Sequence, residues 1–136
     1  MTTLNQIKLF TIAVSMVLFF SMCGKDEDPD TEKPVITVAE PGSNDTISIA
    51  SDPEMHIEFT TTDNIALKSL TVVVNDSSNI EVFREEPNVS GLKVHSYHDH
   101  YMLSGIKKLF QYTVVITATD KSDNVSTKTI PVFVGP

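Results

Sequence analysis

Cysteine and tryptophan are the residues that this chain of 136 residues most clearly lacks: it has one cysteine and no tryptophan. A single cysteine excludes a disulfide bond within the chain and a zinc site made of several thiolates. The core must therefore rest on the burial of aliphatic and phenyl side chains. The length allows one domain of ordinary size and a short appendage.

Positive charge is also scarce. Ten Lys and Arg residues stand against eighteen Asp and Glu residues, which gives a formal net charge of −8. Proteins that bind DNA or RNA present a basic surface, so we expect no nucleic-acid partner. Apolar residues make up 40% and charged residues 21% of the chain, as in globular proteins.

Long apolar runs are rare, and the one that stands out covers residues 9–20 (LFTIAVSMVLFF). A membrane-spanning helix needs about 20 apolar residues, whereas the core of a secretory signal peptide has about 7–15. Cys23 follows three residues later, and residues 24–30 (GKDEDPD) are then strongly acidic. This order predicts a signal peptide over residues 1–22.

The residues around the cysteine resemble the signal of bacterial lipoproteins, in which the cysteine receives the lipid and becomes the first residue of the mature chain. Met22 departs from that signal, which has a small residue before the cysteine. The resemblance implies that Cys23 is lipidated and that the membrane is a partner. The alternative is a plain secretory signal or anchor with an incidental cysteine.

The acidic run predicts a solvated tether over residues 23–33, because it cannot bury apolar surface. It also resembles the export signal of surface lipoproteins in Bacteroidetes. That resemblance implies an outer-membrane lipoprotein of the cell envelope that is exposed at the cell surface.

Residues 34–136 alternate between apolar and polar residues in short segments that turn residues separate. Several short strands at this spacing favour an all-β fold, an antiparallel immunoglobulin-like sandwich of about seven strands. Pro131 lacks a backbone N–H, so its strand is expected at a sheet edge or paired on one side only. Strands are expected around residues 35–38, 46–49, 55–60, 70–74, 112–118 and 129–134.

Two segments carry a resemblance to known domains. Residues 112–120 and the turn 123–126 (DNVS) resemble the last hairpin of bacterial immunoglobulin-like and cadherin-like extracellular domains, and Asp63-Asn64 resembles an earlier turn of the same domains. The stretch 32–136 is similar to a family of uncharacterised Bacteroidetes lipoproteins with one such domain. The resemblance implies a fold and a location, but fold alone implies no activity.

Three of the four histidines lie in residues 94–101 (VHSYHDHY). On an extended strand His98 and His100 point to one face and His95 to the other. A His-x-His pair can give two imidazoles to one ion, Zn or Cu rather than Ca²⁺. The third ligand is expected to be His56, or His95 if the segment is looped. The alternative is a partly exposed strand whose histidines bind no metal ion.

Two acidic turns offer oxygen ligands, from Asp63 in the first and from Asp120, Asp123 and Asn124 in the second. In an immunoglobulin-like sandwich the two turns can emerge at the same end, where Ca²⁺ would find several of the six to eight oxygens that it prefers. The alternative is that these residues only bond their own backbone, as turn residues do.

No catalytic motif stands out, because the chain has neither a G-x-S-x-G elbow nor a glycine-rich phosphate loop. We therefore expect no enzyme. The function predicted first is a non-enzymatic surface module that binds a glycan or an envelope protein, with Tyr97 and Tyr101 as rings that stack on a sugar. The alternative is a lipoprotein that binds a transition metal through His98 and His100.

Overall fold

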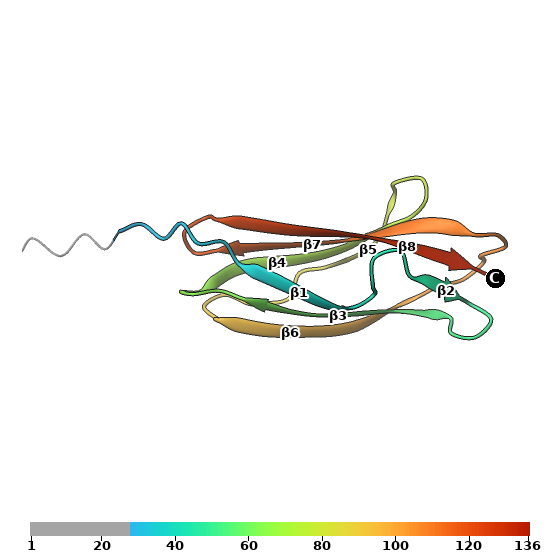
Figure 1. The fold of residues 1–136 in the computed structure, drawn as a ribbon, viewed down its shortest axis with the longest axis horizontal. Coiled ribbons are helices and arrows are strands. Elements are labelled where there is room, and N and C mark those ends of the chain that lie inside the picture. Colours follow the sequence, from blue (N-terminus) through green and yellow to red (C-terminus); the bar gives the residue numbers. More distant parts are fainter. Residues whose placement is uncertain (1–27) are drawn as a thin grey trace, which may run out of the picture.

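The computed structural model describes residues 28–136, and these form two β-sheets packed against each other (Figure 1). This part of the chain contains no helix, and the predicted all-β sandwich is confirmed. The predicted signal peptide, Cys23 and the first residues of the tether lie outside the described residues. The eight strands are β1 (Val35–Glu40), β2 (Thr46–Ser48), β3 (Glu54–Thr62), β4 (Leu67–Asn75), β5 (Glu81–Glu85), β6 (Val94–Met102), β7 (Phe110–Asp120) and β8 (Val125–Gly135).

The smaller sheet has three strands in the order β1-β3-β6, and the larger has five in the order β2-β8-β7-β4-β5. Every neighbouring pair is antiparallel except β2 and β8, which run parallel. Strand β5 had no counterpart among the expected strands, because its residues 81–85 (EVFRE) are exposed except for Phe83, which packs against the core.

The core lies between the sheets and follows the alternation of the sequence. In β3 the side chains of Met55, Ile57 and Phe59 are fully buried, while the residues between them point outward. In β4 the residues Val72 and Val74 face inward in the same way. Each such side chain contributes about 1.5–3 kcal/mol through burial, so the core needs no disulfide or tryptophan.

The last strand does not lie at a sheet edge, which corrects the expectation from Pro131. β8 runs between β7 and β2, because β2 pairs with Phe133 and its neighbours. At Pro131 itself, however, the only ladder partner is Thr113 of β7, since β2 reaches no further than Phe133. The missing N–H therefore falls beyond the β2 ladder, where the carbonyl oxygen of Pro131 still accepts the N–H of Asn44 (2.7 Å).

Four segments meet at one end of the sandwich, at the left in Figure 1, and we call this the tether end: residues 28–34, 63–66, 90–93 and 120–124. Asp63 donates its N–H to the carbonyl oxygen of Lys93 (2.9 Å), and Lys121 donates to that of Ala66 (3.0 Å). The C-terminus lies at the opposite end. Within residues 28–136 there is no helix of the length and apolar character needed to cross a membrane.

Candidate metal centre

The outward face of the three-stranded sheet carries three of the histidines. β3 and β6 both alternate, so that every second residue of each strand points away from the core. Their antiparallel register places His56 directly opposite His100, and Glu58 opposite His98. Side chains that face each other across a strand pair start about 4.5–5.5 Å apart at Cβ. The pairing therefore gathers His56, His98 and His100 on one surface.

These three residues form what we call the histidine site. Each offers a ring nitrogen, and no two of these nitrogens are more than 4.8 Å apart. The Nε2 atoms of His98 and His100 are 3.0 Å apart, and the ring centroids of His56 and His100 are 4.3 Å apart. The imidazoles thus converge as ligands of one ion would, although metal binding itself stays a prediction.

Carboxylates hold two of the three rings. The Nδ1–H of His100 donates to Oε2 of Glu54 (2.9 Å), so Nε2 of that ring carries a lone pair, which accepts a hydrogen bond from Nε2 of His98 (3.0 Å). Oδ2 of Asp52 lies 3.4 Å from Nε2 of His56. Such carboxylate partners fix the orientation and tautomer of metal-ligating histidines.

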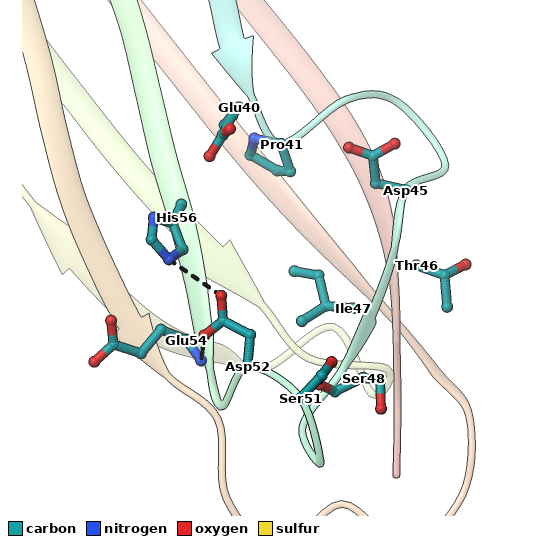
Figure 2. A pocket seen from close by; sticks show the side chains of 10 residues that line it. All are labelled: Glu40, Pro41, Asp45, Thr46, Ile47, Ser48, Ser51, Asp52, Glu54 and His56. Atoms are coloured by element: carbon teal, nitrogen blue, oxygen red, sulfur yellow. Dashed lines mark hydrogen bonds and ion pairs between the residues drawn. The ribbon is translucent and has the colours of Figure 1, made fainter.

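A surface pocket borders the histidine site, and its walls are acidic. Glu40, Asp45, Asp52 and Glu54 line it together with His56, and Figure 2 shows Asp52 reaching His56 along the dashed line. Asp52, Glu54 and His56 also offer ligand atoms within 4.8 Å of one another. The region next to the histidines therefore attracts cations.

The histidine site is open to solvent. The side chains of His56 and His100 are 36% and 39% exposed. An ion can therefore reach the ring nitrogens without any movement of the strands.

His95 does not belong to the histidine site. It pairs with Thr61 across β3 and lies on the inward-facing side of β6, opposite to His98 and His100. The facing of the three residues is thus as expected for a regular strand, and the looped alternative that would recruit His95 is wrong.

Tyr97 is not available as a stacking platform, which corrects the expectation for a sugar-binding ring. Its side chain is 6% exposed and stacks on Phe59 in the core, with 4.9 Å between the ring centroids. Its hydroxyl donates to a carboxylate oxygen of Glu85. Burial, together with that carboxylate, raises the pKa of Tyr97. Tyr101 is half-buried and lies beside Phe83.

The two acidic turns do meet at the tether end, but with a different set of residues from the one expected. Asp63 and Asp120 come together with Asp30 of the tether, each offering an oxygen within 4.8 Å of the others. Asp123 instead pairs with Lys68 and is largely exposed. Asn124 uses its amide N–H groups as donors, to Asp120 Oδ2 (2.7 Å) and to the Asp30 carbonyl oxygen (3.1 Å).

Asp120 is fully buried, and its Oδ1 accepts N–H bonds from Ser122 and Asn124, both of 2.8 Å. Burial raises the pKa of Asp120, but the hydrogen bonds from Asn124, Ser122 and Asp123 outweigh burial and hold it below its usual value. The sequence did not identify Asp30, because nothing in an acidic run indicates which of its residues folds back onto the domain.

Comparisons with known proteins identify a family and a fold. A family model described as "Domain of unknown function (DUF4625)" matches residues 21–132. No curated protein matches the chain.

Two solved structures resemble the sandwich. One is an engineered protein of the Northeast Structural Genomics Consortium, with a TM-score of 0.53 and 16% identity over 76% of this chain and 20% of that one. The other is the beta-glucuronidase of Parabacteroides merdae with glycerol in its active site, with a TM-score of 0.51 and 14% identity over 75% of this chain and 14% of that one. The chain thus spans a fifth or less of each protein, and likeness at these identities shows the fold alone.

Proposed function

Because the chain belongs to the DUF4625 family, whose description assigns no function, we propose one from its geometry: a non-enzymatic, membrane-anchored lipoprotein module that binds a transition-metal ion at the histidine site. The observation that carries this proposal is the convergence of three imidazoles from two paired strands. The ion is Zn²⁺ or Cu²⁺, for which imidazole is a favoured ligand.

The spacing of the ring nitrogens supports this function. Zn–N distances of about 2.0–2.1 Å in a tetrahedral site place two ligating nitrogens about 3.3 Å apart. The Nε2 atoms of His98 and His100 are 3.0 Å apart, close to that value. His56 is the third ligand, because it offers a ring nitrogen within 4.8 Å of those of His98 and His100. The fourth position is left to water or to Glu58, which lies opposite His98 in the register of β3 and β6.

The charges around the site favour a cation. β3 and β6 contain no Lys or Arg, while Glu54 and Glu58 lie on their outward face. Asp52 adds a carboxylate next to His56. A metal ion with neutral imidazole ligands keeps its double positive charge, and these carboxylates compensate it.

An open sheet face also supports binding rather than catalysis. Enzyme sites are enclosed and carry a nucleophile or base held in a defined geometry. Here the imidazoles lie on an open strand face, where the side chains of His56 and His100 are 36% and 39% exposed.

Calorimetric titration of the full chain with ZnCl₂ tests the metal site. We expect one ion per chain, and at least about a 100-fold loss of affinity in the His98→Ala, His100→Ala double variant, because two of three ligands are removed. His95→Ala is the matched control and should bind like the unmodified chain. No heat with the unmodified chain, or equal affinity in the double variant, contradicts the proposal.

The membrane anchor of this proposal is a lipid on Cys23. The apolar run of residues 9–20 before it and the acidic tether after it support a lipoprotein signal. Each buried methylene of an acyl chain contributes about 0.8 kcal/mol, and more than one chain gives stable attachment. The orientation proposed is toward the outside of the outer membrane.

Labelling with a radioactive fatty acid tests the anchor. Cys23→Ala should abolish the label and release the protein from the membrane fraction. Ser21→Ala, the control, should keep the label and stay in the membrane fraction. Protease treatment of intact cells tests the orientation, since a surface domain is digested. A Cys23→Ala protein that stays labelled contradicts the anchor, and a domain that stays protected contradicts the surface location.

A further inference from the structure

The tether end carries a second group of ligand atoms that the histidine site does not use. Asp30, Asp63 and Asp120 each offer a carboxylate oxygen, and these oxygens lie within 4.8 Å of one another. The residues come from three separate segments: the tether, the loop between β3 and β4, and the last residue of β7. Three like charges are thus held together by parts of the chain that are distant in sequence.

Two of the three carboxylates are half satisfied. Oδ1 of Asp63 accepts the N–H of Ile65 (3.0 Å), and Oδ1 of Asp30 accepts the N–H of Glu32 (3.1 Å). The Oδ2 atoms of Asp63 and Asp30 are buried and have no hydrogen-bond partner among the described residues. Asp63 as a residue keeps some exposed surface, whereas its carboxylate is buried. Burying a carboxylate oxygen without a partner costs free energy, because the oxygen loses its hydrogen bonds to water. Each of these two atoms therefore needs a hydrogen-bond donor or a cation.

No cationic side chain supplies that ligand within residues 28–136. None of the ion pairs found there includes Asp30, Asp63 or Asp120. Of the nearby lysines, Lys68 pairs with Asp123 and Lys93 donates to the carbonyl oxygen of Asn64 (2.8 Å). The ion pairs of residues 28–136 include neither Lys33 nor Lys121. The convergence of carboxylates is therefore left without a compensating positive charge.

We propose that Asp30, Asp63 and Asp120 bind a Ca²⁺ ion that joins the tether to the end of the sandwich. All donors are oxygens, which Ca²⁺ prefers, whereas Zn²⁺ and Cu²⁺ favour nitrogen and sulfur. Carboxylates that bind through one or two oxygens, completed by water, supply the six to eight ligands of Ca²⁺. Mg²⁺ fits less well because it requires a nearly ideal octahedron.

The ion has a structural consequence, because one of its ligands belongs to the tether. Hydrogen bonds already hold this segment: Asn64 Nδ2 donates to Asp30 Oδ1 (3.1 Å), and Asn124 Nδ2 donates to the carbonyl oxygens of Asp30 (3.1 Å) and Glu32 (3.3 Å). With Ca²⁺ bound, residues 30–34 are fixed to both loops. Without it, the carboxylates repel one another, and the tether is held by the hydrogen bonds from Asn64, Asn124 and Ser126. Bound calcium thus fixes the orientation of the sandwich relative to its tether.

Calorimetric titration of the full chain with CaCl₂ tests the site. We expect one ion per chain and a dissociation constant near 10⁻⁴–10⁻³ M, about the range of extracellular calcium modules. Asp30→Asn and Asp63→Asn should each weaken binding at least about tenfold. Asp30→Asn lies outside the sandwich, so its effect does not depend on folding. Asp123→Asn removes the same charge nearby and is the matched control.

Two results would overturn the site: no binding up to about 10⁻² M Ca²⁺, well above the expected range, or an Asp123→Asn variant weakened as much as Asp63→Asn. Tighter binding of Mg²⁺ than of Ca²⁺ would overturn the identity of the ion. Ca²⁺ binding should persist in the His98→Ala, His100→Ala variant, so the two metal sites succeed or fail separately.

Amide hydrogen exchange of residues 30–33 tests the consequence for the tether. We expect Ca²⁺ to slow exchange at these amides in the unmodified chain and in Asp123→Asn, but not in Asp30→Asn. Exchange that is equal with Ca²⁺ and with a chelator in the unmodified chain would overturn the coupling of the ion to the tether.

Discussion

The histidine site and the carboxylates of the tether end are built in opposite ways. The histidine site stands on two strands of one antiparallel pair, on an open face where the side chains of His56 and His100 are 36% and 39% exposed. The carboxylates come from the tether, a loop and the end of a strand, and their oxygens are buried. Regular pairing thus creates an accessible site from residues close in register, whereas loop packing creates an enclosed site from residues distant in sequence.

The largest effect is expected from a substitution in the core of β3, the strand that supports both sites. Phe59 is fully buried on β3, between His56 of the one site and Asp63 of the other. Phe59→Ala leaves a cavity and should lower the free energy of unfolding by about 3–5 kcal/mol, measured in urea. Val35→Ala, at an exposed position of β1, is the control. A loss below 1 kcal/mol would mean that β3 is not the common scaffold of both sites.

A single histidine should separate the two sites. His56→Ala removes one of three imidazoles and should weaken Zn²⁺ binding about 100-fold, while Ca²⁺ binding is unchanged. Thr60→Ala, at an outward position further along β3, is the control for shortening a side chain on this face. Calorimetric titration with each ion measures both effects. If both affinities fall together, the sites are coupled through β3 and the contrast drawn above is wrong.

Calcium should stabilise the fold through the buried site. At a free Ca²⁺ concentration ten times the dissociation constant, binding contributes about 1.4 kcal/mol and raises the Tm by about 5 °C. Asp63→Asn should remove this gain, since it removes a ligand with a buried oxygen. Thermal unfolding with and without a chelator provides the measurement. An equal gain in Asp63→Asn would place the stabilising ion elsewhere.

Glu54 should act through His100 rather than on the ion. Its carboxylate accepts the Nδ1–H of that ring at 2.9 Å, so Glu54→Gln loses the charge that orients the ring. Losing such a partner costs about tenfold in metal affinity. Glu81→Gln, which removes a carboxylate paired with Arg84, is the control. A loss as large as that of His56→Ala would indicate that Glu54 is itself a ligand.

The smallest effect is expected from the exposed pair at the tether end. Lys68 and Asp123 form an ion pair in which the side chains are 54% and 72% exposed. Such pairs contribute about 0–1 kcal/mol to stability. Lys68→Ala should therefore lower the free energy of unfolding, measured in urea, by at most about 1 kcal/mol and leave the Ca²⁺ affinity unchanged. A marked loss of Ca²⁺ affinity would show that Lys68 and Asp123 support the carboxylates.

The histidine face was predictable in large part because period-two alternation carries over to a regular strand. The opposite facing of His95 relative to His98 and His100 follows from spacing alone. The partner strand, however, is set by register: His56 lies opposite His100 because β3 and β6 pair, and no local pattern specifies that pairing. The burial of Tyr97 against Phe59 has the same origin, since it depends on which strand lies across the core.

The acidic turns were predictable as turns, but which of their carboxylates come together was not. Asp63 and Asp120 were expected at one end, and they meet there. Asp123 follows Asp120 by only three residues, yet it adopts a left-handed conformation (φ 67°) and pairs with Lys68 instead. Conformation within a four-residue turn decides which carboxylate faces the tether.

The sequence by itself determined the all-β fold, the inward and outward residues of the main strands, and the net negative charge of the chain. These features depend on side-chain periodicity and composition, which are local. Only the tertiary structure decided which strands pair, which aspartate of the tether folds back, and which carboxylate oxygens lose their water. Those outcomes depend on contacts between residues far apart in the chain, whose energies no short segment contains.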